Sequence, residues 1–302
     1  MLVLTTALLL DIMAGEYPDR VHPVVWMGRF GRFWYSLSRF STARGNILSG
    51  AGLVLTASSL FALAASSIIA FSGQLSPWLE PLMSALILKS TFSFAGLLRS
   101  GARISETLRH KDHFQARRDL TWLCSRDSSS FIETDFASGA ISSLSENLSD
   151  SFIAPLFFYT LFGIPGAVVY RVVNTLDANF GYRNKEFEFF GKAPALTDDV
   201  LNFLPARMTG LLIVLFAFIR PANGVRGFRT MLSDHRKTPS PNGGWPMAAT
   251  AGALGVRLSK PGCYTLFAAG SEPGRKDINR AIRLMGWTGA GAMVLFIAGG
   301  IW

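Results

Sequence analysis

The sequence predicts an all-α, polytopic integral membrane protein with about four to six membrane-embedded helices and cytoplasmic polar loops. Three observations support this class: 49% of the 302 residues are hydrophobic, only 16% are charged, and the apolar residues occur in long runs. An ordinary soluble domain of this size is less apolar and carries more charge. We expect residues 1–302 to form a single integral membrane domain.

The apolar segments set the positions of the predicted helices. They cover residues about 1–14, 47–72, 75–98, 152–173, 201–219 and 284–302. The first lacks the basic flank and cleavage site of a signal peptide, so we expect a retained helix that is short for a full crossing. The second has no charge over a length sufficient to cross a bilayer. The third follows closely as a return helix, and we expect its Glu80 and Lys89 to face protein.

The fourth apolar segment is interrupted by Gly163-Ile164-Pro165-Gly166. Proline removes a backbone donor and loosens the helix there. A full crossing would put Asp150 and Asp177 on opposite sides of the membrane, whereas a re-entrant hairpin would return both to one side. We favour the hairpin. The fifth segment reaches spanning length only if its helix begins near Leu201, and the sixth supplies a last helix.

Basic residues set the predicted orientation. Residues 20–44 hold five arginines and no acid, and residues 220–283 hold eleven basic and three acidic residues. By the positive-inside rule both stretches face the cytoplasm, together with the polar segments 99–151, 174–207 and 220–283 that we expect to be catalytic. We therefore interpret the net charge of +9 as a membrane-orientation signal and expect no nucleic-acid partner. The two cysteines indicate neither a disulfide framework nor a zinc site.

Carboxylates and amides form three short clusters beside apolar segments, at 146–150, 174–177 and 198–202. In each cluster an Asn and an Asp lie three residues apart, which puts both side chains on one helical face. Charges beside lipid are costly and usually serve a function, and such oxygen ligands suit Mg²⁺. The predicted metal ligands are Glu146, Asp150, Asp177, Asp198 and Asp199, with Asn147, Asn174 and Asn202 as neutral co-ligands. The predicted catalytic residues are Glu146, Asp150, Asp177 and Asp199.

Some of the carboxylates also fit a structural role. One of Asp198 and Asp199, though not both, fits an N-cap for the apolar helix that follows. Asp119, Asp127 and Asp135 fit a solvated loop or a helix cap as well as they fit a site. These alternatives stay open on the sequence alone.

Motifs along the chain carry a family resemblance. From Ala116 onward the sequence contains ARRDLTWLCSRD, SSLSENLSDSFIAPLFFYTLFGIPGAVVYRVVNTLDANFGYRN and FFGKAPALTDDVLNFLPARMTG. HPVVWMGR begins at His22, and SPNGGWPMAATAGALGVRL begins at Ser240. In this order, and over nearly the whole chain, these motifs resemble the adenosylcobinamide-phosphate synthase family of cobalamin biosynthesis.

The resemblance implies an amide-forming carbon–nitrogen ligase of the cell membrane. Its substrates would be the corrinoid adenosylcobyric acid, through a propionate carboxylate, and aminopropanol or its O-phosphate. ATP and Mg²⁺ would serve as cofactors at an active site on the cytoplasmic side. Because the chain has no Walker A motif, nucleotide use follows from the resemblance alone. Membrane lipid and other membrane enzymes of late cobalamin assembly are the remaining expected partners.

Basic and amide side chains are the candidates for holding phosphate or substrate, because a guanidinium fork matches phosphate and carboxylate groups. They are Arg117, Arg118, Arg126, Asn147, Asn174, Arg183, Arg207, His22, Ser240 and Asn242. Ser240 and Asn242 belong to the turn-forming run SPNGGWP, which fits a loop that closes over a ligand as well as an ordinary tight loop. A lone His before Pro, as at His22, also fits a turn or packing residue.

The chain departs from the family pattern at Ser151, at Cys124-Ser125 and at Met247, where Gly, Val-Gly and Glu are more usual. The last change removes any role for a late-loop carboxylate. Two other classes stay open. A membrane transporter also shows intramembrane carboxylates and an interrupted helix, although no repeat is evident. A non-catalytic scaffold of a corrinoid-processing complex would not need the carboxylates for synthesis.

Overall fold

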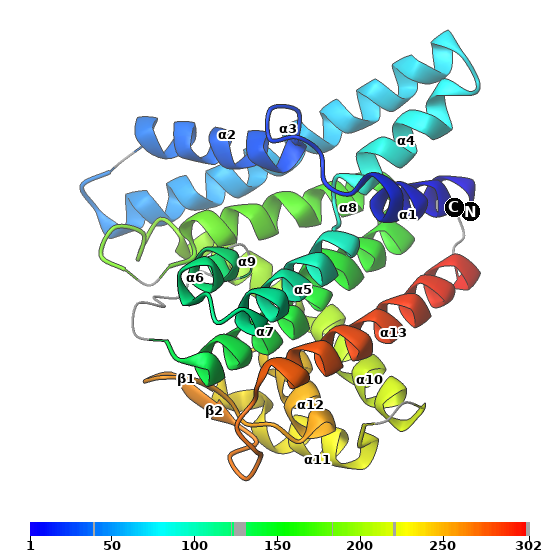
Figure 1. Cartoon of the computed structure of the whole chain (residues 1–302). Coiled ribbons are helices and arrows are strands. Elements are labelled where there is room, and N and C mark those ends of the chain that lie inside the picture. The colour runs from blue at the N-terminus through cyan, green and yellow to red at the C-terminus, as the bar shows by residue number, and fades with distance from the viewer. Residues whose placement is uncertain (39, 122, 124–130, 183, 220–221, 300–302) are drawn as a thin grey trace. The chain divides into compact units, whose positions relative to one another are not determined.

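The computed structural model describes residues 1–302 except 39, 122, 124–130, 183, 220–221 and 300–302. In the described part of the chain, helices are joined by short connections and accompanied by a small antiparallel pair of strands (Figure 1). The predicted all-α class is confirmed. The chain divides into two compact units, each built from segments that are distant in sequence.

Three helical stretches among the described residues are long and apolar enough to cross a membrane. They are Ala43–Leu75, Glu133–Phe180 and Arg275–Gly299. A fourth arises if Lys192–Leu201 and Phe203–Ile219, which are bent by 48° at their junction, form one broken span. The short apolar helix Leu2–Ala14 corresponds to the first predicted segment but, at about 1.5 Å per residue, is too short to cross.

The first unit comprises Met1–Ser93, Ala154–Leu201 and the chain from Phe296 onward. Its helices are α1 (Leu2–Ala14), α2 (Pro23–Leu37), α3 (Ala43–Leu75), α4 (Leu79–Lys89), α8 (Ala154–Phe180) and α9 (Lys192–Leu201). α3 packs along α8, and α1 packs on α4 (Figure 1). Buried side chains from α2, α3 and α8, among them Met27, Leu53 and Leu176, form its apolar core.

The second unit comprises Phe94–Ile153 and Asn202–Leu295. Its helices and strands are α5 (Ala95–Arg109), α6 (His113–Thr121), α7 (Glu133–Leu148), the π-helical turn η1 (Ser149–Ile153), α10 (Phe203–Ile219), α11 (Gly224–Asp234), the 3₁₀ turn η2 (His235–Lys237), α12 (Gly244–Leu254), β1 (Leu258–Lys260), β2 (Tyr264–Leu266) and most of α13 (Arg275–Gly299). α7 is buried from Phe136 to Ser145, and α12 is buried along almost its whole length. These two helices form the centre of the unit.

The predicted return helix over residues 75–98 is not continuous. α4 ends at Lys89, where the hydroxyls of Ser90 and Thr91 donate to the carbonyls of Ile87 and Leu88, both at 2.7 Å. Such local side-chain bonds compete with helix continuation. Lys89 is buried as expected, but the prediction that Glu80 faces protein is wrong. Glu80 is exposed in the first turn of α4, where the helix dipole favours a carboxylate.

The predicted interruption of the fourth segment is confirmed at Gly163, whose φ of 65° and ψ of −160° are non-helical. The rings of Phe158 and Tyr170 are stacked with centroids 5.2 Å apart, although a straight helix would separate these positions by roughly 18 Å. A Cβ on Gly166 would lie 2.6 Å from the carbonyl oxygen of Phe158, eight residues away. The chain therefore turns back on itself within α8. The side of the membrane that it returns to stays a prediction.

The helices of the fifth and sixth apolar segments begin earlier in the chain than the hydropathy indicated. α13 begins at Arg275, ahead of the predicted segment 284–302, where the Asp277 carboxylate accepts from the backbone N–H of Gly274 at 3.1 Å. α9 likewise begins at Lys192, so Asp198 and Asp199 lie inside a helix. The N-cap alternative for these two carboxylates is therefore wrong.

Candidate functional site

A pocket of about 340 Å³ in the second unit collects the first carboxylate–amide cluster. We call it the carboxylate pocket. It is lined by Leu123, Ser143, Glu146, Asn147, Asp150, Thr238, Pro239, Ser240, Met247, Lys260 and Tyr264. Four of the predicted site residues, Glu146, Asn147, Asp150 and Ser240, therefore line one cavity.

Helical spacing explains why α7 supplies most of this polar wall. Ser143, Glu146, Asn147 and Asp150 stand at positions i, i+3, i+4 and i+7, which is one face of a helix. Asp150 lies in η1, where the helix passes into a single π turn. Such turns interrupt regular helix packing and recur at functional sites. The π turn thus carries a carboxylate at the end of a polar face.

The loop after η2 brings Ser240 to the same pocket. The Ser240 hydroxyl accepts from the backbone N–H groups of Asn242 and Gly243, at 3.2 and 3.3 Å, which closes a tight polar turn. A Cβ on Gly243 would lie 2.5 Å from Glu146 Oε1. Because only glycine leaves room for this carboxylate, the loop and α7 approach each other closely at Glu146.

The β1–β2 hairpin supplies a positively charged residue to the carboxylate pocket. Lys260 and Tyr264 are cross-strand partners in the antiparallel pair, and both line the pocket. The Tyr264 hydroxyl lies 3.6 Å from the sulfur of Met247, another lining residue. The pocket thus combines two carboxylates with one ammonium group and one phenol.

The Asn147 side chain is oriented by the protein. Its amide nitrogen donates to the carbonyls of Ser143 and Leu123, at 3.0 and 3.3 Å, and its oxygen accepts from the Ser151 hydroxyl at 3.4 Å. Ser151 thus has a role at the position where the family more often has Gly. With its nitrogen held by two carbonyl groups, Asn147 turns its oxygen to Ser151.

The second and third clusters meet in the first unit. Arg171 donates to the Asn174 oxygen at 3.3 Å, and the Asn174 nitrogen donates to Asp198 at 3.2 Å. The Asn174 oxygen thus accepts a hydrogen bond from an arginine, and its role as a metal co-ligand stays a prediction. Asp177 packs its carboxylate against Gly181, and Asp199 lies one residue from Asp198 in α9. Asn202, the last member of the third cluster, belongs to the second unit and is buried.

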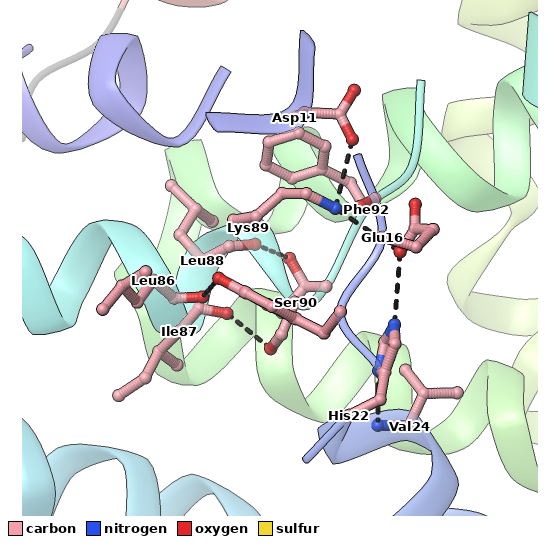
Figure 2. A network of polar contacts seen from close by, with 12 residues as sticks. Asp11, Glu16, His22, Val24, Leu86, Ile87, Leu88, Lys89, Ser90 and Phe92 are labelled. Atoms are coloured by element: carbon pink, nitrogen blue, oxygen red, sulfur yellow. Dashed lines mark hydrogen bonds and ion pairs between the residues drawn. The ribbon is translucent and has the colours of Figure 1, made fainter. Parts of the chain in front are cut away.

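An ionic network at the N-terminus surrounds His22 (Figure 2). Lys89 lies 3.1 Å from Asp11 and 3.4 Å from Glu16, and Glu16 lies 3.2 Å from His22 Nε2. His22 Nδ1 accepts from the backbone N–H of Val24 at 3.2 Å and so caps α2. His22 therefore carries its proton on Nε2 and donates it to Glu16. These contacts fit the turn alternative, and a substrate-binding role for His22 stays a prediction.

The Glu16 carboxylate is kept ionised by this network. Burial alone raises the pKa of Glu16, but hydrogen bonds from His22 and Ser93 and the charge of Lys89 outweigh burial and lower the pKa to about 2. Glu16 thus stays negative at all physiological pH values, between a buried ammonium and an imidazole.

The predicted arginines lie in different surroundings. Arg117 and Arg118 are on α6, with Arg118 exposed. Arg207 on α10 donates to Asn242 at 3.3 Å, so these two predicted residues are in direct contact. Arg126 and Arg183, together with Asp127, lie outside the described residues.

Two of the open carboxylates are structural. Asp119 is buried and accepts from Thr107 at 2.7 Å and from Gln115 at 3.0 Å. Asp135 accepts from the backbone N–H of Ile132 at 3.1 Å, at the start of α7. The helix-cap alternative for Asp135 is confirmed.

The donor chemistry of the carboxylate pocket fits Mg²⁺. Among the described residues, no group of three or more His, Cys, Asp and Glu side chains is placed to hold a metal ion. Mg²⁺ usually keeps several waters and binds through one or two protein carboxylates together with substrate phosphates. Glu146 and Asp150 would supply these two carboxylates. The five-carboxylate ligand set stays a prediction.

The sequence reasoning missed several lining residues. Ser143 continues the polar face of α7 and was detectable from its i, i+3, i+4, i+7 spacing. Lys260 and Tyr264 carried no such signal, because a short hairpin more than a hundred residues away brings them to the pocket. Lys89 was expected to face protein, but its partner Asp11 was not identified from the sequence.

The fold and the pocket define a class: a polytopic helical membrane protein with a carboxylate–amide pocket facing a lysine. The family model described as CobD/Cbib protein matches residues 4–285. This chain therefore belongs to the CobD/Cbib family of cobalamin biosynthesis proteins.

Curated relatives agree with this family. The chain is 41% identical over 264 residues to the probable cobalamin biosynthesis protein CobD of Methanothermobacter thermautotrophicus, an alignment that covers 87% of this chain and 86% of the relative. It is 37% identical over 267 residues to the cobalamin biosynthesis protein CobD of Dehalococcoides mccartyi, covering 88% and 86%. It is 39% identical over 287 residues to the probable CobD of Pyrococcus abyssi, covering 93% and 90%. No solved structure matches the chain.

Proposed function

We propose that this protein is an adenosylcobinamide-phosphate synthase, a ligase that joins aminopropanol or its O-phosphate to a propionate carboxylate of adenosylcobyric acid. The observation that carries the proposal is the carboxylate pocket, found in a chain of a cobalamin biosynthesis family. The proposed reaction takes place at the cytoplasmic face of the cell membrane. Membrane lipid and neighbouring enzymes of late cobalamin assembly are its proposed partners.

Amide formation from a carboxylate in water needs activation of the acid. ATP, when bound, would supply the phosphoryl group that turns the propionate into an acyl phosphate and releases ADP. Mg²⁺, when bound, would supply positive charge that neutralises phosphate oxygens. Glu146 and Asp150 are the residues proposed to hold that ion, because both are hard oxygen ligands in one pocket.

Side chains of the pocket would then bind the phosphate and accept the proton that the amine loses. In the second step the amine nitrogen bonds to the acyl carbon, the carbon–oxygen bond to phosphate breaks, and the nitrogen loses a proton. A carboxylate that lines the pocket, Glu146 or Asp150, would accept that proton. Lys260 in the same pocket would bind the phosphate as it leaves. Asn147, oriented by two carbonyl groups, would position the amine or its hydroxyl.

The test is a reconstituted reaction. Purified full-length protein in lipid is incubated with ATP, Mg²⁺, adenosylcobyric acid and either aminopropanol or its phosphate, and the corrinoid is analysed by mass spectrometry. We expect a mass gain of one amine minus one water, with release of ADP. No mass gain with either amine would refute the proposal. Solute movement across vesicles without ADP release would favour the transporter alternative.

A further inference from the structure

A second pocket of about 380 Å³ adjoins the carboxylate pocket in the same unit. We call it the guanidinium pocket. It is lined by Arg207, His235, Arg236, Thr238, Pro239, Pro241 and Trp245. Thr238 and Pro239 line both pockets, so a single stretch of backbone separates them. None of the described residues that line it is a carboxylate.

Arg207 is held rigidly at the wall of this pocket. Its guanidinium lies 3.5 Å from the centroid of the Phe203 ring and 4.7 Å from that of the Trp245 ring. Nη1 donates to the carbonyl of Phe203 at 2.6 Å and to the Asn242 oxygen at 3.3 Å. Nε and Nη2 have no hydrogen-bond partner in the described part of the chain. These donors form the fork that matches an oxyanion.

Two rings of the lining hold each other and Arg207 in place. His235 Nδ1 donates to the carbonyls of Met231 and Leu232, at 3.0 and 3.2 Å, and its ring packs on Trp245 with centroids 4.0 Å apart. The Trp245 ring in turn contacts the Arg207 guanidinium. These contacts fix the direction of the guanidinium fork.

The carboxylate of Asp234, the residue before His235, pairs with Lys237 and not with Arg236. Its carboxylate accepts from the backbone N–H of Phe267 at 2.7 Å and from Ser233 at 2.8 Å, and it pairs with Lys237 at 2.7 Å. Burial raises the pKa of Asp234, but the hydrogen bonds and charge of Lys237, Phe267 and Ser233 lower it overall. This carboxylate is thus occupied by Lys237, and Arg236 makes no ion pair or hydrogen bond with any described residue.

We infer that the guanidinium pocket binds the phosphate group of a phosphorylated ligand. Its wall offers two guanidinium groups, and none of its described lining residues is a carboxylate, which is the chemistry of phosphate recognition. The inference rests on the proposed function, whose ligands offer two sources of phosphate: the phosphorylated amino alcohol and the nucleotide. In either case the phosphate lies on one side of the Thr238–Pro239 backbone and the reacting carboxylates on the other.

The test measures equilibrium binding to the full-length protein in lipid nanodiscs by titration calorimetry. Aminopropanol phosphate and ATP are titrated separately, with free aminopropanol as the ligand without phosphate. The variants are Arg236→Gln, which removes a lining charge, and Arg207→Lys, which keeps the charge and removes the guanidinium fork. Arg229→Gln is the matched control, because Arg229 is exposed on α11, makes no hydrogen bond or ion pair with the described residues and does not line the pocket.

We expect Arg236→Gln and Arg207→Lys each to weaken binding of one phosphorylated ligand by about tenfold or more, with Arg229→Gln binding as the unmodified protein does. The ligand that loses affinity identifies the source of the phosphate. Unmodified protein that binds neither ligand, variants that bind both normally, or an equal loss in Arg229→Gln would each overturn the inference. Thermal unfolding of each variant checks its fold. Pocket-dependent binding without amide synthesis would refute the proposed function and leave this inference standing.

Discussion

Lys89 joins α4 to α1 through an ion pair with Asp11 in which both side chains are almost fully buried, with 1% and 0% of their areas exposed. A buried charge without its partner is strongly destabilising, by about 3–5 kcal/mol. Lys89→Met should therefore lower the free energy of unfolding by about that amount. Reversible unfolding in detergent measures this change. In the double variant Asp11→Asn/Lys89→Met most of the loss should be recovered, and equal destabilisation of the single and double variants would contradict the pairing.

Glu16 should make the stability of the fold depend on pH in the acid range. Its folded-state pKa of about 2 is below its ordinary value of 4.5, so the folded protein binds this proton more weakly than the unfolded chain does. The stabilisation is fully present above about pH 4.5 and is lost as the pH falls through 2. Because 40% of the side chain is exposed, screening limits the effect to about 1 kcal/mol.

Glu16→Gln should accordingly unfold at a lower temperature than the unmodified protein at pH 7. The difference should shrink as the pH approaches 2. Glu80→Gln, at an exposed carboxylate of α4, serves as the control and should follow the unmodified protein throughout. A constant difference at every pH would contradict the assignment of the low pKa to Glu16.

Asp150→Asn should lower the rate of amide synthesis by roughly a hundredfold or more, because it removes a charge proposed to hold the metal ion or accept the proton. The matched control is Asp135→Asn on the same helical stretch. Asp135 accepts from the N–H of Ile132, so its loss should cost stability of about 1 kcal/mol and leave turnover unchanged. Initial rates at saturating substrate measure both. Equal activities of the two variants would argue against the carboxylate pocket.

Gly243→Ala should impair activity without unfolding the protein. The new Cβ would lie 2.5 Å from Glu146 Oε1, and the flexible end of the glutamate would move away. We expect at least a tenfold fall in turnover, since displacements of about 1 Å in a catalytic site can cost up to a hundredfold. Gly274→Ala is the control, because a Cβ there meets no atom within 4 Å. Normal turnover in Gly243→Ala would show that the position of Glu146 does not matter.

Cysteine labelling should decide the side of the membrane reached after α8. Asn184 is exposed and follows α8, so Asn184→Cys should react with a membrane-impermeant reagent in inside-out vesicles and not in intact cells. Labelling from the outside only would contradict the prediction that the chain returns to the cytoplasmic side after α8.

The sequence predicted the features that depend on local pattern. The break at Gly163-Ile164-Pro165-Gly166 followed from backbone chemistry, and the shared face of Asn147 and Asp150 followed from helical period. Hydropathy did not reveal the end of α4, because the hydroxyls of Ser90 and Thr91 end the helix within an apolar segment.

Contacts between residues that are distant in sequence could not be predicted from local pattern. The β1–β2 hairpin brings Lys260 to the pocket that Glu146 lines, and tertiary packing places Trp245 between Arg207 and His235. Neither contact follows from a regular spacing of residues in the sequence. The hydrogen bonds from Arg171 to Asn174 and from Asn174 to Asp198 could be predicted only in part. Asn174 and Asp198 were both predicted as site residues, but the direction of the Asn174 amide, which turns its oxygen to Arg171, depends on the folded neighbours.

The reversal at Gly163 also has an electrostatic consequence. The segment before it ends with carbonyl groups that carry roughly half a negative charge, and the segment after it begins with N–H groups that carry roughly half a positive charge. Because the chain turns back there, the two partial charges lie next to each other and largely cancel. A bend between apolar segments would otherwise leave backbone dipoles that lipid cannot solvate. The hairpin can therefore be buried in an apolar medium without a compensating ion.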